Sequence, residues 1–149
     1  MFLSTAIVTL FSIHAIICED VKTIDVKTSS GVVRGQTLVF NNKPIDQFLG
    51  IPYAVPPLGA LRFSKPKSID KPAVEIIDAT AAKFSCMQKD GTGLLKVSED
   101  CLVVDVWAPH RGKSQIAEPL KPVMFWIYGG SLTSGSIFLP TYDGRPLAT

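Results

Sequence analysis

A run of seven mostly apolar residues, Pro122–Tyr128, followed directly by Gly129, Gly130 and Ser131, constrains the fold more than any other stretch of this sequence. Such a run is typical of a strand buried on both faces, inside a sheet covered by helices. Adjacent glycines at the carboxyl end of a strand let backbone N–H groups turn into open space, where open α/β sheets bind ligands. We therefore interpret residues 129–131 as a turn for an anion or a developing oxyanion. The alternative is a plain tight connection. A phosphate loop fits less well, because neither Gly-Lys-Ser/Thr nor a G-x-G-x-x-G spacing occurs here.

The composition is that of one globular domain. The chain has 149 residues, of which 46% are hydrophobic and 19% charged. Its net charge of +2 comes from 15 basic and 13 acidic side chains that are scattered singly, which argues against a nucleic-acid partner. Residues 142–149 contain no closing helix pattern, so we expect the chain to be part of a longer protein.

The first 18 residues are predicted to be a secretory signal. Met1 to Cys18 contains no charged side chain, and its apolar run is too short and too interrupted for a membrane span. We place the cleavage after Cys18 and expect a secreted protein, with His14 discarded in the signal. The sequence assigns neither a membrane anchor nor an oligomeric state, and no cofactor is predicted.

Two cysteines, Cys86 and Cys101, remain if cleavage follows Cys18. An even pair in an oxidising compartment usually forms a disulfide. The chain-entropy model gives about 3 kcal/mol of stabilisation for a loop of this length. A metal site is the poorer alternative, because no histidine lies near either cysteine.

Alternating patterns predict an antiparallel opening. Residues 23–28 and 32–40 are expected to form a hairpin around Ser29-Ser30-Gly31, and Asn41–Pro44 a second turn before an extended segment at 45–49. A further strand is predicted at 102–107 and should stop at Ala108-Pro109.

The remaining segments are less regular. Residues 50–63 carry three prolines among large apolar groups and are interpreted as a buried, ordered loop, whereas 64–73 read as surface loop. Arg62 is expected either to pair with Glu99 or Asp100 or to be solvated. Residues 76–84 fit a short strand or one or two helical turns. His110 is interpreted as a solvated loop histidine, because nothing near it in sequence is suited to act as nucleophile or orienting carboxylate.

Three motifs together resemble the type-B carboxylesterase and cholinesterase family. Residues 99–109, EDCLVVDVWAP, are similar to its E-D-C-L strand. Residues 48–63, FLGIPYAVPPLGALRF, are similar to its proline-rich stretch, and residues 126–136, WIYGGSLTSGS, to its W-I-[HY]-G-G-G-F-x-x-G-S turn. The resemblance extends from about Gly31 to the end of the chain.

The resemblance implies an α/β-hydrolase fold, with short antiparallel strands that lead into a mostly parallel central sheet. It also implies ester hydrolysis by a serine on a G-x-S-x-G elbow, with a histidine and an acid. The amides of Gly130 and Ser131 match the family's oxyanion donors, Gly129 gives the turn its freedom, and Cys86 and Cys101 match its first disulfide. The implied ligand is a small-molecule ester, and neither a cofactor nor a metal is expected.

Two departures from the family pattern stand out. Ser131 replaces a third glycine, which costs on the order of 1 kcal/mol if φ there must be positive. No G-x-S-x-G occurs in the chain, so 19–149 is expected to be an amino-terminal fragment, inactive and poorly soluble alone because the strand at 123–128 lacks neighbours. The rival hypotheses are a non-catalytic adhesion or binding protein with the same fold and a truncated gene model.

The substrate class is narrowed by one absence in the sequence. Cholinesterases place a tryptophan in the first disulfide loop to stack on a quaternary ammonium group. Residues 87–100 contain none, so choline esters are disfavoured and a general carboxylesterase is expected.

Overall fold

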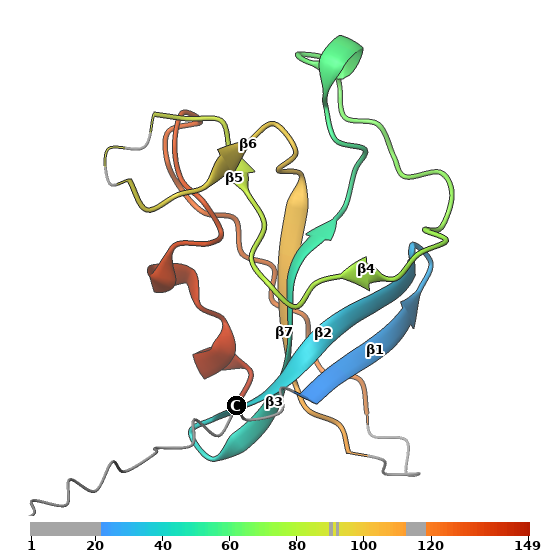
Figure 1. The fold of residues 1–149 in the computed structure, drawn as a ribbon. Helices are drawn as coiled ribbons and strands as arrows, with labels where there is room; N and C mark the ends of the chain where they lie inside the picture. The colour runs from blue at the N-terminus through green and yellow to red at the C-terminus, as the bar shows by residue number, and fades with distance from the viewer. Residues whose placement is uncertain (1–21, 90, 92, 113–118) are drawn as a thin grey trace, which may run out of the picture.

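The structure is a computed structural model and describes residues 22–89, 91, 93–112 and 119–149. The predicted signal at 1–18 lies outside this part. Figure 1 shows a twisted sheet with an excursion of loops and short elements at one end. The sheet has five strands: β1 (Lys22–Thr28), β2 (Gly31–Phe40), β3 (Lys43–Pro52), β4 (Ile77–Asp78) and β7 (Val103–Pro109).

The smaller elements lie outside this sheet. β5 (Ser85–Cys86) and β6 (Val97–Ser98) pair in parallel. The described chain also contains three short 3₁₀ turns, η1 (Gly59–Leu61), η2 (Pro140–Tyr142) and η3 (Arg145–Leu147). The described residues contain no α-helix, and therefore none that is long and apolar enough to cross a membrane.

The predicted hairpin is confirmed. β1 pairs antiparallel with β2 from Lys22↔Thr37 to Thr28↔Gly31. Asn41 and Asn42 then take φ values of 49° and 61°, which is the two-residue turn that matches strand twist. The second turn is shorter than predicted, since β3 starts at Lys43 and Pro44 already pairs with Val39.

β7 joins the sheet along β3 in antiparallel register, from Ile45↔Pro109 to Pro52↔Val103. The predicted stop at Ala108-Pro109 is wrong by two residues, because both pair with β3. The register shifts between Phe48 and Ile51, where Gly50 has φ of 74°. This bulge turns the Gly50 N–H toward the Asp105 carboxylate, 2.7 Å away.

The core is small and lies against one face of β2 and β3. It consists of Val33, Phe48 and Ala79, with Ile24, Ile51 and Ile77 packed against it. β4 pairs in parallel with β2 at Val33 and Arg34, which brings Ala79 onto this cluster. The strand alternative for residues 76–84 is therefore confirmed.

Two segments that the sequence predicts to be buried are exposed in the described structure. Residues 122–128 form no strand, and the side chains of Val123 to Ile127 are 66–92% exposed, because no strand of the described structure pairs with this segment. The antiparallel part of the predicted sheet is present, whereas its parallel central part is not. The loop at 50–63 buries only its first residues: Ala54 is 5% exposed, but Phe63 is 98% exposed, because η1 carries the chain away from the sheet.

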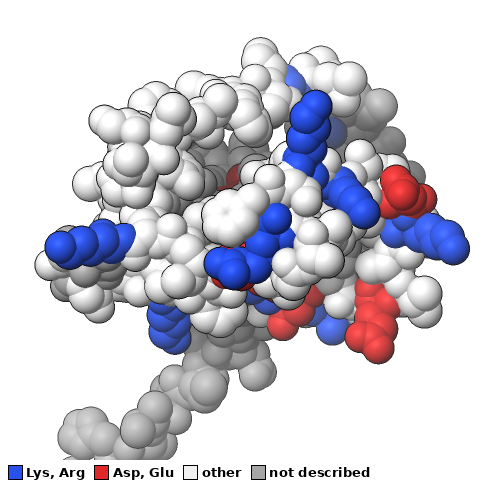
Figure 2. All heavy atoms as spheres, turned by 90° about the horizontal axis from the view of Figure 1, so that it is seen from above, with Lys and Arg blue, Asp and Glu red and all other residues white. Residues whose placement is uncertain are grey.

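The predicted disulfide joins Cys86 to Cys101, with the two Cα atoms 5.0 Å apart. It ties β5 to the segment that enters β7, and β6 lies within the loop that it closes. Figure 2 views this end of the molecule and shows Lys and Arg side chains scattered, with acidic side chains among them.

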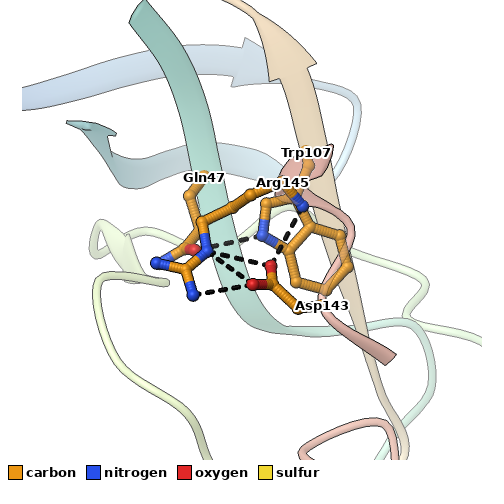
Figure 3. Close-up of polar contacts among 4 residues, drawn as sticks. All are labelled: Gln47, Trp107, Asp143 and Arg145. Carbon is orange, nitrogen blue, oxygen red and sulfur yellow. Dashed lines mark hydrogen bonds and ion pairs between the residues drawn. The ribbon is translucent and has the colours of Figure 1, made fainter. Parts of the chain in front are cut away.

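The carboxyl-terminal segment lies against the sheet through Arg145 and Gly144, and Asp143 orients Arg145 (Figure 3). Asp143 accepts from the Arg145 backbone N–H and guanidinium at 2.8–3.0 Å. The Arg145 guanidinium lies 5.4 Å from the centre of the Phe40 ring. Gly144 lies so close to Trp107 that a Cβ would be 2.4 Å from its ring. The Trp107 indole N–H donates to Gln47 at 3.0 Å.

A first prediction concerns the stability of this sheet. Burial raises the pKa of Asp105 to about 6, against the lowering effect of the Gly50 N–H. The folded state therefore holds a proton that the unfolded state releases above about pH 4, and the stability due to that proton is lost as the pH rises through 6. Asp105→Asn keeps an oxygen for Gly50 and should raise the free energy of unfolding at pH 7 by about 1–2 kcal/mol, allowing for solvent screening.

Urea unfolding at pH 4 and pH 7 measures this effect on the protein expressed from its complete coding sequence. The gain should vanish at pH 4. The exposed Asp70→Asn is the control and should change stability at neither pH. An Asp105→Asn protein with no gain at pH 7 would contradict the prediction.

Candidate functional site

The Gly-Gly-Ser turn has positive φ angles and is closed by hydrogen bonds within its own loop. Gly130, Ser131 and Leu132 have φ values of 151°, 53° and 60°. The Gly130 carbonyl accepts the backbone N–H groups of Thr133 and Ser134 at 3.0 and 3.1 Å. The loop thus has a fixed shape although residues 129–134 are exposed to solvent.

The backbone N–H groups at the head of this loop donate to no other part of the described structure. Within the described structure, the hydrogen bonds of the loop use the Gly130 carbonyl as acceptor, and none uses the N–H of Gly129, Gly130 or Ser131 as donor. Successive unpaired N–H groups in a turn form a concavity suited to an anion. The three residues singled out from the sequence therefore lie together in one exposed turn.

Gly130 cannot be replaced in this geometry. A Cβ on it would lie 1.9 Å from the Ser134 carbonyl oxygen, which is backbone and cannot rotate away. Glycine is therefore required by close approach as well as by its φ of 151°.

The far side of the loop is attached to the disulfide region. Gln88 donates its side-chain amide to the Gly135 carbonyl and accepts the Gly135 N–H, both at 2.8 Å. Ser136, which is 1% exposed, has its hydroxyl 2.6 Å from that of Ser85 in β5. The Ser85–Ser136 contact borders a small cavity of about 80 Å³ lined by Tyr53, Phe84, Tyr128 and Phe138 together with the disulfide.

His110 is not the solvated histidine expected from the sequence. Its Nδ1 lies 2.8 Å from a carboxylate oxygen of Asp46, and its side chain is 18% exposed. Asp46 also accepts the Thr37 hydroxyl at 2.7 Å. The two residues are 64 positions apart, and only the β3–β7 register, which pairs Ile45 with Pro109, brings them together.

The open question for Arg62 is settled. Its Nε lies 2.6 Å from a carboxylate oxygen of Glu99. The side chains are 51% and 34% exposed, so solvent screens the pair and it contributes little stability.

In the described ranges, no group of three or more His, Cys, Asp or Glu side chains lies close enough to hold a metal ion.

A second prediction concerns the one residue of the turn that is not glycine. The φ of 53° at Ser131 puts a Cβ in a left-handed conformation, which costs roughly 1 kcal/mol. Ser131→Gly removes this cost and should raise the free energy of unfolding by up to about 1 kcal/mol. The exposed Ser64 has no positive φ, so Ser64→Gly should be neutral or slightly destabilising. Equal responses of the two variants in urea unfolding would contradict this assignment of strain.

Comparison with known proteins identifies the chain's relatives. The family model described as "Carboxylesterase family" matches residues 22–149. The chain is 41% identical over 138 residues to the acetylcholinesterase of Gallus gallus, covering 83% of this chain and 17% of that protein. It is 38% identical over 142 residues to the acetylcholinesterase of Leptinotarsa decemlineata, covering 83% and 22%.

The cholinesterase of Mus musculus is a third relative, 39% identical over 136 residues, with 83% of this chain and 21% of that protein covered. The chain thus spans about a fifth of the length of these curated relatives. Because the family match covers every described residue, including the disulfide and the Gly-Gly-Ser turn, the chain belongs to the carboxylesterase family.

Proposed function

We propose that this chain is the amino-terminal portion of a secreted serine carboxylesterase, and that residues 129–131 supply its oxyanion donors. The observation that carries the proposal is the exposed turn whose Gly130 and Ser131 N–H groups are unpaired in the described structure. Family membership supports ester hydrolysis as the reaction. The relatives are about five times as long as the matched stretch, which leaves room for the remaining catalytic groups.

The turn acts on the transition state of acyl transfer. Attack of a serine on the ester carbonyl places negative charge on the carbonyl oxygen, and donors fixed in advance stabilise this charge without reorganising. Two successive amides suit this role because the closed loop holds them in place. The serine on its elbow, the histidine and the acid come from the rest of the protein in this proposal.

The proposal gives the exposed apolar segment a place in the fold. Residues 122–128 become a central strand once parallel neighbours from the rest of an α/β-hydrolase sheet flank them. Their present exposure supports this, because a run of large apolar side chains on a surface marks a site that another part covers. In this proposal residues 1–18 are a signal peptide, and residues 19–149 are the amino-terminal portion of the esterase domain.

Secretion is supported by the disulfide and by the apolar leader. A disulfide persists in an oxidising compartment. The uncharged segment Met1–Cys18 fits a cleaved signal better than a membrane span.

The substrate is proposed to be a neutral or lipophilic ester. The named relatives include acetylcholinesterases, but residues 87–100 of this chain contain no tryptophan to stack on a quaternary ammonium group. A general carboxylic ester therefore fits this chain better than a choline ester.

A third prediction tests the reaction and the substrate class together. The protein expressed from its complete coding sequence should hydrolyse 4-nitrophenyl butyrate with a higher kcat/KM than butyrylthiocholine, which carries the same acyl group. Gly130→Ala keeps the backbone N–H, but its Cβ clashes with the Ser134 carbonyl oxygen and must displace the turn. It should therefore lower kcat by about 10²–10³-fold, the usual effect of losing an oxyanion donor. Gly112→Ala is the control, because a Cβ there meets nothing within 4 Å.

Rates are normalised to active sites titrated with a fluorophosphonate. Wild-type protein that neither reacts with this probe nor hydrolyses either ester would contradict the proposal and favour the non-catalytic adhesion or binding protein. Preference for the thiocholine ester would contradict the substrate assignment alone.

A further inference from the structure

We propose that Gln88 is a positioning residue for the oxyanion turn and that it couples the turn to the Cys86–Cys101 disulfide. The inference rests on the proposed function and goes beyond it by assigning a role to a side chain 41 positions before Gly129 in the sequence. Gln88 is two residues past the end of β5 and makes three hydrogen bonds with backbone.

Gln88 contacts both backbone polar groups of Gly135. Its side-chain oxygen accepts the Gly135 N–H and its nitrogen donates to the Gly135 carbonyl, each at 2.8 Å. A side-chain amide that pairs with both polar groups of one residue fixes the position and the orientation of that residue. Gly135 is therefore held as it would be by a neighbouring strand.

Gly135 packs against the start of the turn. Gly135 has φ of 111°, and a Cβ on it would lie 2.6 Å from the Gly129 carbonyl oxygen and 2.7 Å from the Tyr128 ring. The backbone of Gly135 is thus packed directly under the first residue of the turn. A shift of Gly135 must move Gly129, and with it the amides that follow.

Gln88 is also hydrogen-bonded to the residue that carries the disulfide. The same side-chain nitrogen donates to the Cys86 carbonyl at 3.1 Å, and Cys86 is bonded to Cys101 at the entry to β7. A second contact runs beside it, from Ser85 to the buried hydroxyl of Ser136. The turn itself is exposed, so these contacts are its attachment to the sheet.

Gln88 touches neither the proposed oxyanion nor the reacting atoms. It can therefore affect the rate only by changing the positions of the Gly130 and Ser131 N–H groups. A misplacement of about 1 Å in an active site costs up to about 10²-fold in rate. We expect Gln88→Met, which has similar length and no polar pair, to lower kcat by about 10- to 100-fold with KM changed less than about threefold.

The readout specific to the oxyanion donors is the rate ratio between an ester and its thionoester. Sulfur is larger than oxygen and a weaker acceptor, so a well-placed pair of N–H donors favours the ester strongly. This ratio should fall by about tenfold or more in Gln88→Met. It does not depend on how much of the protein is folded, because both rates come from the same preparation.

Gln47→Met is the matched control. It also removes a side-chain amide from a part-buried hydrogen bond, that to Trp107 at 3.0 Å, but on the sheet rather than at the turn. It should lower stability and leave the ester-to-thionoester ratio unchanged. Gln88→Glu keeps the acceptor for the Gly135 N–H but sets a carboxylate oxygen against the Gly135 and Cys86 carbonyl oxygens, so its ratio should also fall.

The experiment uses the protein expressed from its complete coding sequence. An active wild type in which Gln88→Met keeps the wild-type ratio, as Gln47→Met does, overturns the role of Gln88 and leaves the proposed function intact. If Gln88→Met has no measurable activity, Gln88→Glu decides: a lowered ratio supports the inference and an unchanged ratio overturns it. A wild type without esterase activity overturns the proposed function, and the inference with it.

Discussion

The antiparallel pairing of β3 with β7 is the interaction on which the other polar contacts of the sheet depend. Its register sets Asp46 beside His110, Gln47 beside Trp107 and the bulge at Gly50 against Asp105. Each pair joins residues more than 50 positions apart, so none forms without the register. Cys101 lies two residues before β7, so the disulfide is attached at the start of this paired strand.

The disulfide and the residues beside it connect the start of β7 to the loop that bears the turn. The disulfide fixes the strand before Gln88, and Gln88 and Ser85 contact the segment that follows the turn. The turn is therefore placed by a covalent bond and a few hydrogen bonds instead of by a packed core. This arrangement suits a group of backbone donors, which must be open to a substrate and still be held in one position.

A second attachment acts on the carboxyl-terminal side of the exposed apolar segment. Tyr142 lies 6.1 Å from Trp126 and 6.4 Å from Tyr128 between ring centres, while Arg145 contacts Phe40 and Gly144 packs against Trp107. The segment 122–128 is thus held near the sheet at its end without pairing to it. Within the described ranges no strand pairs with it, so its backbone donors and acceptors stay available to another strand.

The sequence predicted the local elements and missed what depends on long-range register. Alternation and the Asn-Asn turn were enough for the first three strands, because those signals are local. Burial at 122–128 is not found because an apolar run needs neighbours that the described structure does not contain. His110 was misread because its partner lies on another strand, although placing Pro109 opposite Ile45 would have revealed Asp46. Gln88 carries no sequence signal, because amide-to-backbone contacts follow no spacing rule.

The most direct test of the central claim is a crystal structure of the complete protein after reaction with a fluorophosphonate. The phosphonyl oxygen on the modified serine stands in for the oxyanion of the transition state. The account predicts that this oxygen lies about 2.7–3.1 Å from the backbone nitrogens of Gly130 and Ser131. A phosphonyl oxygen bound by other donors, with residues 129–131 turned away from it, would contradict the account.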